Sequence, residues 1–207
     1  MATLELFFDC SSPWTYLAFA GIQPIAARHG VDITWKPILV GGVFNAVNKE
    51  VYENRANPNP LRWSYMRKDL EDWSRAYGLE IGWPPVFPVN SVKAMRGAFV
   101  AEDAGLIVPY CTAVFETYWG RLEDISQDEV LARVVSELGM DADGFFSAIA
   151  TPDYKARLRS TTDELVARGG FGSPTIFVNG TDMYFGNDRL TLVDRALGLA
   201  LADERRA

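Results

Sequence analysis

A serine and a proline stand where a short apolar segment gives way to a long helix-like one, in the sequence Ser12-Pro13-Trp14-Thr15. The N-terminus of a helix carries free N–H groups and about half an elementary positive charge. An anion is stabilised there, and a bound thiolate is such an anion, so the pKa of a thiol falls in this setting. The alternative is that Ser11 or Ser12 only caps the helix, because Ser-Pro helix starts are common.

A second turn, Gly172-Ser173-Pro174-Thr175, follows a helix stop and precedes a strand-like run. A cis peptide bond before Pro174 would hold the backbone of Ser173 in a tight turn, where it could pair with an extended peptide as a short added strand. The alternative is an ordinary trans proline at the start of a strand.

Several other polar residues allow a binding role without requiring one. Asp188 precedes the last predicted helix and could bind an ammonium or N–H group, although helix capping explains it equally well. Asn48 lies in a polar stretch and by itself indicates nothing. Six basic side chains could meet a carboxylate substrate, although most basic residues are simply solvated: Lys36, Arg62, Arg67, Lys68, Lys93 and Arg96.

The cysteine and histidine content excludes several kinds of chemistry. The two cysteines, Cys10 and Cys111, are far apart in sequence, so no C-x-x-C motif exists and neither a zinc ribbon nor a dithiol redox site is expected. Both are expected to be buried as small apolar residues. The single histidine, His29, leaves little room for histidine-based catalysis, and we expect no metal site.

The bulk composition narrows the choice of partner. The 207 residues carry a formal net charge of −7, which argues against a nucleic-acid groove because such a groove needs a basic stripe. No apolar stretch approaches the ~20 residues of a membrane span. The first nine residues hold no base and no small-residue cleavage site, so they do not resemble a signal peptide. We therefore expect a cytoplasmic protein that binds neither nucleic acid nor membrane.

The elements that must position these residues follow from periodicity and turn signals. A strand at 4–8, a helix at 14–27 and a strand at 31–37 are expected first, and a helix at 151–168, strands at 175–178 and 182–185 and a helix at 189–201 are expected last. Asn179-Gly180 is a strong hairpin signal. Helices are expected between them at 61–77, 92–104, 109–121, 127–138 and 142–150, after a loop around Pro58 and Pro60.

Two helix starts carry capping signals. Ser126 and Glu129 have the spacing of a capping box. Asn187 and Asp188 can cap the last helix.

This order of elements predicts a thioredoxin-like α/β fold, βαβ…αββα, with a large all-helical insertion. The thioredoxin-like domain would comprise residues 1–40 and 151–207, and the inserted helical domain residues 41–150. The alternative from the pattern alone is a generic α/β fold with a separate helical lobe.

The motifs together resemble a known family. Phe7-Phe8-Asp9, leading into the Ser-Pro turn at 12–17, is similar to the opening of the 2-hydroxychromene-2-carboxylate isomerases, which are related to kappa-class glutathione transferases in the DsbA-like branch of the thioredoxin superfamily. The resemblance continues in order through residues 37–44, 65–70, 87–91, 94–96, 171–175 and 185–190. The segment 45–60 is longer than in the simplest family pattern.

The resemblance implies that glutathione is the cofactor. Ser12 matches the serine that hydrogen-bonds the glutathione sulfur, at the position where dithiol relatives carry C-P-x-C. Pro174 matches the family's cis-proline, and the backbone of Ser173 the group that pairs with the cysteinyl part. Asn187 and Asp188 match the pair that holds the γ-glutamyl end. Asn48 matches an asparagine near the substrate and the thiol.

The resemblance also implies an activity, a glutathione-dependent cis/trans isomerase acting on a conjugated aromatic carboxylate in aromatic-compound catabolism, in a homodimer. One alternative is a kappa-like glutathione S-transferase, in which the thiolate stays attached to its substrate. Another is a non-catalytic glutathione-binding protein of the same fold.

Overall fold

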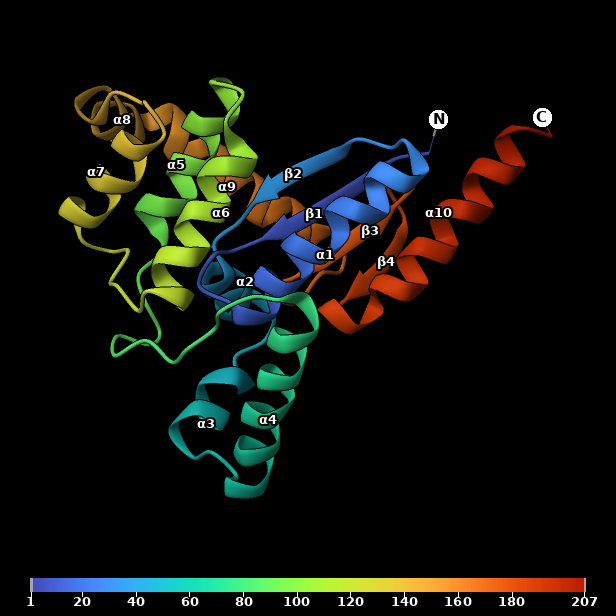
Figure 1. The fold of residues 1–207 in the computed structure, drawn as a ribbon, viewed down its shortest axis with the longest axis horizontal. Coiled ribbons are helices and arrows are strands. Elements are labelled where there is room, and N and C mark those ends of the chain that lie inside the picture. The colour runs from blue at the N-terminus through green and yellow to red at the C-terminus, as the bar shows by residue number, and fades with distance from the viewer. Residues whose placement is uncertain (1, 207) are drawn as a thin grey trace.

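A four-stranded mixed sheet joins the two ends of the chain in the computed structural model, which describes residues 2–206 (Figure 1). Strand β1 (Leu4–Phe8) pairs in parallel with β2 (Ile33–Pro37) and antiparallel with β3 (Thr175–Val178), which pairs antiparallel with β4 (Asp182–Phe185). The strand order β2-β1-β3-β4 confirms the expected thioredoxin-like sheet.

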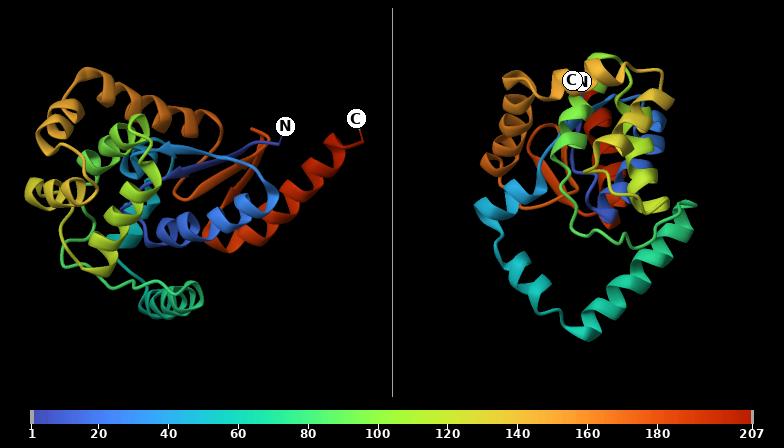
Figure 2. Two further views of the ribbon diagram at one scale, coloured as in Figure 1. Left: turned by 45° about the horizontal axis from the view of Figure 1, so that its top comes forward. Right: turned by 90° about the vertical axis from the view of Figure 1, so that its left-hand side faces the viewer.

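Helices cover both faces of this sheet (Figure 2). Successive side chains of β1 point to opposite faces of the sheet, so neighbouring residues pack into different apolar clusters. Leu6 and Phe8 belong to the main apolar core, whereas Phe7 packs with Phe177 in a second, smaller cluster. The main core includes residues of α1 (Pro13–His29) and α10 (Leu190–Glu204), and the second cluster includes residues of α2 (Val40–Val47) and α9 (Pro152–Ala167).

Helix α1 begins and ends where the sequence predicts. Ser12 is its N-cap, with Oγ accepting a hydrogen bond from the Thr15 N–H at 3.3 Å, and Pro13 is the first helical residue. Gly30 ends the helix in the left-handed conformation, with φ of 65°. Because the first turn is fixed by a side-chain cap and a proline, the N-terminus of α1 is a defined structural point.

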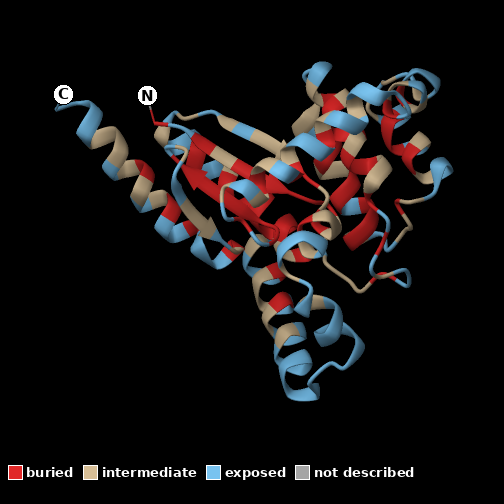
Figure 3. Ribbon diagram, turned by 180° about the vertical axis from the view of Figure 1, so that it is seen from behind, coloured by how far each residue is buried: buried red, intermediate tan, exposed pale blue. Residues whose placement is uncertain are grey.

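The predicted helical block is present and supplies about half of the main apolar core (Figure 3). Its helices are α4 (Pro60–Tyr77), α5 (Val92–Asp103), α6 (Ile107–Phe115), α7 (Asp128–Glu137) and α8 (Ala142–Ile149), and α6 continues through one π-helical turn at Glu116–Gly120. Trp119 in that turn is fully buried. The division into residues 1–40 plus 151–207 and 41–150 stays a prediction.

Two short helices lie between the second strand and the loop around Pro58 and Pro60, where the sequence patterns predict no helix. Helix α2 contains Gly41 and Gly42, which are poor helix formers, yet the Val40 N–H at its start donates to the Asp9 side chain and the helix packs against α9. Helix α3 (Glu50–Ala56) has no buried residue. Tertiary contacts that no local pattern reveals therefore overrule propensity in α2. Helices α3 and α4 project from the body, and we call residues 48–77 the arm (Figure 1).

The capping predictions were wrong at two helices. Helix α7 begins after Gln127 without a side-chain cap, because the Asp124 carboxylate takes the Ser126 N–H instead. A 3₁₀ turn at Asn187–Arg189 precedes α10, so Arg189 stands at the cap position and no side chain caps that helix. The Asn179-Gly180 hairpin turn is confirmed, with φ of 51° and 74°.

Within residues 2–206, no helix is both long enough and apolar enough to cross a lipid bilayer.

Close packing at Gly97 of α5 gives a test of the helical block. A Cβ there would overlap the ring of Phe145 and the hydroxyl of Tyr110, whereas Gly41 of α2 faces open space. We expect Gly97→Ala to lower the free energy of unfolding by about 1–3 kcal/mol, as overpacking does. Gly41→Ala is the control and should be neutral or stabilising by up to ~1 kcal/mol. Urea denaturation of both variants measures the difference, and equal stabilities would contradict this packing.

Candidate functional site

A cavity of about 840 Å³ lies beside the N-terminus of α1. Its wall is made by the start of α1, by α2, by the arm, by the segment 83–92, and by the turn at Gly172 and Ser173 together with Phe185. This volume is near the upper end of the range of about 300–1,000 Å³ that is usual for ligand pockets. The cavity therefore has room for more than one small ligand.

The two turns singled out in the sequence meet at one edge of this cavity. Ser12 Oγ donates to the Ser173 carbonyl oxygen at 3.3 Å, and Thr15 Oγ1 lies 2.8 Å from Ser173 Oγ. Ser12 and Ser173 both line the cavity. The Ser173-Pro174 peptide bond is cis. The serine hydroxyl at the start of α1 thus lies against the backbone of the cis-proline turn, 161 residues away in sequence.

Asn48 joins the same edge from the other side. It lines the cavity as the C-cap residue of α2, and its Nδ2 donates to the Phe171 carbonyl oxygen at 3.2 Å. The side chain thereby ties the end of α2 to the segment that leads into the cis-proline turn.

The Asn187-Asp188 pair lies beside the cis-proline but not on the cavity wall. The Gly186 N–H donates to the Pro174 carbonyl oxygen at 3.2 Å, which places the turn next to that residue. Asn187 is buried, and its Nδ2 has no hydrogen-bond partner within residues 2–206. Asp188 is exposed and pairs with Arg189 at 3.1 Å. Asn187 therefore carries an unpaired buried donor, which is unfavourable, beside the cis-proline turn but away from the cavity wall.

Asp9 is a site residue that the sequence patterns did not single out. Its side chain is 0% exposed and accepts three hydrogen bonds, from the Ser11 N–H at 2.9 Å, the Val40 N–H at 2.8 Å and Ser91 Oγ at 3.1 Å. Its own N–H donates to Ser173 Oγ at 3.0 Å. Burial raises the pKa of Asp9, and the hydrogen bonds from its partners act in the opposite direction.

Arg55 is the second residue that the sequence patterns missed, because it lies in the segment interpreted as a loop. Its guanidinium carbon is 5.5 Å from the ring centres of both Phe44 and Phe87, and the residue lines the cavity. Desolvation lowers the pKa of Arg55. It forms no ion pair or hydrogen bond with any residue from 2 to 206. An accessible cation between two aromatic rings and without an acid partner is suited to bind a ligand anion.

Of the six basic residues considered from the sequence, Arg62 lines the cavity and the other five do not. Lys36 is 3.1 Å from Glu164, and Lys93 is 2.5 Å from Asp128. Lys68 pairs with Asp72 on the surface of α4. Lys36 and Lys93 are thus already neutralised by carboxylates on the protein.

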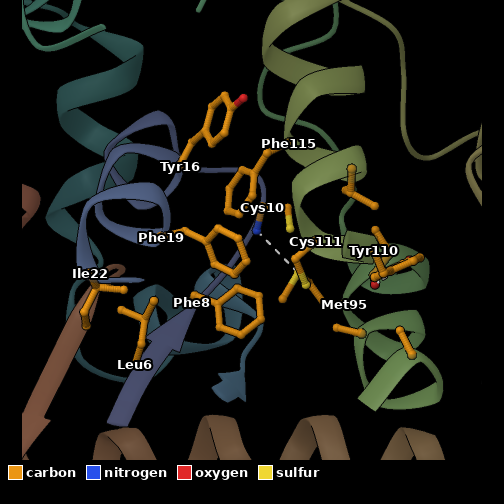
Figure 4. Close-up of a cluster of buried hydrophobic side chains, with 14 of the residues drawn as sticks. Leu6, Phe8, Cys10, Tyr16, Phe19, Ile22, Met95, Tyr110, Cys111 and Phe115 are labelled. Atoms are coloured by element: carbon orange, nitrogen blue, oxygen red, sulfur yellow. Dashed lines mark hydrogen bonds between the residues drawn. The ribbon is translucent and has the colours of Figure 1, made fainter. Parts of the chain in front are cut away.

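The two cysteines lie in the core behind the Ser-Pro turn (Figure 4). The Cys10 N–H points to the Met95 sulfur at 3.3 Å, and the Cys10 carbonyl oxygen accepts a hydrogen bond from Trp119 Nε1 at 2.9 Å. Burial raises the pKa of the Cys10 thiol, and the neighbouring Cys111 thiol adds to the shift. Cys10 is therefore a packing residue that holds the turn in place. Between residues 2 and 206, no cluster of three His, Cys, Asp or Glu side chains could hold a metal ion.

Comparison with known proteins gives consistent matches along the chain. The family model of the DSBA-like thioredoxin domain matches residues 3–198. A 2-hydroxychromene-2-carboxylate isomerase from Pseudomonas putida is 31% identical over 199 residues, which cover 94% of each chain. Glutathione S-transferase kappa 1 from Homo sapiens is 28% identical over 209 residues, 95% of this chain and 91% of the relative. A solved structure of a 2-hydroxychromene-2-carboxylate isomerase has a TM-score of 0.83 at 25% identity, over 99% of this chain and 98% of that one.

The raised pKa of Asp9 predicts a pH dependence of stability. The folded state binds the Asp9 proton more tightly than the unfolded chain, so the contribution is full below the ordinary pKa and is lost as pH rises through the raised pKa. We expect the unfolding free energy of the wild type minus that of Asp9→Asn to fall over this interval. Urea denaturation at matched pH values measures it. A difference that grows with pH would mean that the three hydrogen bonds outweigh burial.

Proposed function

Because the chain belongs to the DSBA-like thioredoxin domain family and, within it, to the 2-hydroxychromene-2-carboxylate isomerases, we propose that it is a glutathione-dependent cis/trans isomerase of a conjugated aromatic carboxylate. The observation that carries the proposal is the Ser12 hydroxyl, held at the N-terminus of α1 against the Ser173 backbone and open to the cavity. Neither cysteine lines the cavity, so the nucleophile is assigned to the cofactor.

The residues around the two turns fit a bound glutathione. When glutathione binds, the Ser12 hydroxyl would turn from the Ser173 carbonyl oxygen to donate to the thiolate. The backbone of Ser173 beside cis-Pro174, released from that bond, would pair with the cysteinyl part. The unpartnered Nδ2 of Asn187 and the exposed carboxylate of Asp188 would meet the γ-glutamyl end, which carries both an ammonium and a carboxylate group. Asn48 would lie near the thiol and the substrate.

When bound, glutathione supplies a thiolate whose reversible addition to the conjugated double bond makes that bond single for long enough to rotate. Ser12 and the N-terminus of α1 keep the sulfur ionised at neutral pH, because both stabilise a negative charge. The guanidinium of Arg55 holds the substrate carboxylate or the oxygen on which negative charge develops. Phe44 and Phe87 pack against the guanidinium and partly desolvate it, which strengthens this contact.

The relationship to kappa-class proteins supports one other candidate, a glutathione S-transferase. In that reaction the thiolate displaces a leaving group and the product remains a glutathione conjugate, whereas an isomerase regenerates free glutathione. Mass spectrometry of the products separates the two reactions. Binding of glutathione without any reaction would instead indicate the non-catalytic alternative. We place the protein in the cytoplasm, where thiols stay reduced, and the homodimer stays a prediction.

Calorimetric titration with glutathione, combined with thiolate absorbance in the ultraviolet across pH, tests the proposal directly. We expect binding together with a thiol pKa clearly below that of free glutathione. An absence of binding at millimolar glutathione would mean that Ser12 is only a helix cap.

The role of Ser12 gives a specific prediction. Ser12→Ala removes one donor from the thiolate, so we expect the pKa of the bound thiol to rise and turnover at neutral pH to fall ~10²-fold or more. Activity should partly return at higher pH, where the thiol ionises without help. Steady-state rates and thiolate absorbance across pH measure both effects, and unchanged turnover at neutral pH would overturn the role.

Arg55 gives a second prediction. We expect Arg55→Ala to lower kcat/KM for a carboxylate substrate by roughly 10–100-fold, because a hydrogen bond between charged groups contributes about 1.5–3 kcal/mol. The methyl ester of the same substrate should lose little. Arg67→Ala is the matched control, since Arg67 lies on α4 outside the cavity wall. An equal loss for acid and ester would contradict carboxylate binding by Arg55.

A further inference from the structure

One part of the cavity wall is an array of three aromatic rings. Trp63 of α4 meets Trp83 at 5.0 Å between ring centres, and Trp83 meets Phe87 at 4.9 Å. All three line the cavity. Trp83 and Phe87 also contact the buried Trp119, at 6.3 and 6.1 Å. The array is therefore anchored in the core at one end, while Trp63 extends it onto the arm.

The core of the protein does not account for Trp63. The buried residues of α4 are Leu70 and Ser74, and Trp63 itself is 37% exposed. A large aromatic ring that stays partly in water beside a cavity offers apolar area to a ligand. Trp73, on the same helix, packs on Tyr77 at 5.9 Å and does not line the cavity.

The aromatic array adjoins Arg55, the residue proposed to bind the substrate carboxylate. The ring of Phe87 contacts both the guanidinium of Arg55 and the ring of Trp83. A carboxylate held by Arg55 would therefore place the attached aromatic system along Phe87 and Trp83. A benzene-sized group would meet these two rings, and a second fused ring would extend it toward Trp63, which contacts Trp83.

We propose that Trp63 and Trp83 form a subsite for a second fused aromatic ring, so that the preferred substrate carries a bicyclic rather than a monocyclic aromatic group beside its carboxylate. This inference takes the reaction from the proposed isomerase function, and it derives the substrate specificity from the residues of the cavity wall. The volume of about 840 Å³ agrees with a bicyclic substrate beside glutathione. The subsite is independent of the chemistry at Ser12, because no residue of the array belongs to the two turns.

Binding of simple aromatic acids tests the subsite without any reaction. Titration of the glutathione-saturated protein with 2-naphthoate and benzoate should give tighter binding of naphthoate, and Trp63→Ala should weaken naphthoate binding about 3–10-fold while leaving benzoate unchanged. Trp73→Ala is the matched control and should alter neither. Equal effects of Trp63→Ala on both acids, or no preference in the wild type, would overturn the subsite.

Kinetics separate this proposal from the proposed function. With conjugated carboxylates that carry either a naphthalene or a benzene ring, we expect Trp63→Ala to lower kcat/KM about 3–10-fold for the naphthalene substrate only. If no isomerisation occurs but naphthoate binding depends on Trp63, the reaction is wrong and the subsite stands. If isomerisation occurs and both substrates respond alike, the subsite is wrong and the reaction stands.

Discussion

The hydrogen bonds of Asp9 are the interaction on which the site depends. Its side chain joins the turn before Ser12, the start of α2 and the residue before α5, and its backbone N–H joins the cis-proline turn through Ser173. Four segments that are distant in sequence thus share one buried residue at the end of β1. A carboxyl group that satisfies several buried donors is difficult to replace, since each donor left alone costs about 1–3 kcal/mol.

The electrostatics of the cavity suit two anions at once. The N-terminus of α1 and the guanidinium of Arg55 are both positive. Among the residues from 2 to 206 that line the cavity, the one acidic side chain is Asp9, and burial raises its pKa. A thiolate and a substrate carboxylate would repel one another in a site of low dielectric constant. Two separate positive groups would offset that repulsion and hold the two reacting molecules of the proposed reaction in a fixed relative position.

Residues with local signals could be predicted from the sequence, and residues that depend on distant partners could not. The Ser12 cap, the Gly30 end of α1 and the Asn179-Gly180 turn each follow from chemistry within a few positions, and the structure confirms them. Helix α2 contains a glycine pair and is supported by the Val40 bond to Asp9 and by packing against α9, so no local pattern predicts it.

The same distinction explains the missed site residues and the wrong caps. Arg55 lies in a segment whose helix has no buried residue, and its partners Phe44 and Phe87 come from two other elements. At Ser126 a competing carboxylate, Asp124, took the bond that the capping pattern assigns. The resemblance to a family supplied the roles of Asn187 and Asn48, which their own surroundings in the sequence do not indicate.

The arm makes part of the cavity wall and almost none of the core. Helix α3 buries no residue, and α4 buries two. A natural domain has a net folding stability of only about 5–15 kcal/mol. A substitution at a ligand-contacting position that is also part of the core is therefore tolerated only if its loss of stability stays below that value. Substitutions at the exposed positions of the arm cost little of this stability, because those side chains contribute nothing to the core. The arm is consequently the part of the molecule where descendants of this chain can acquire new specificities while the sheet and the two turns stay constant.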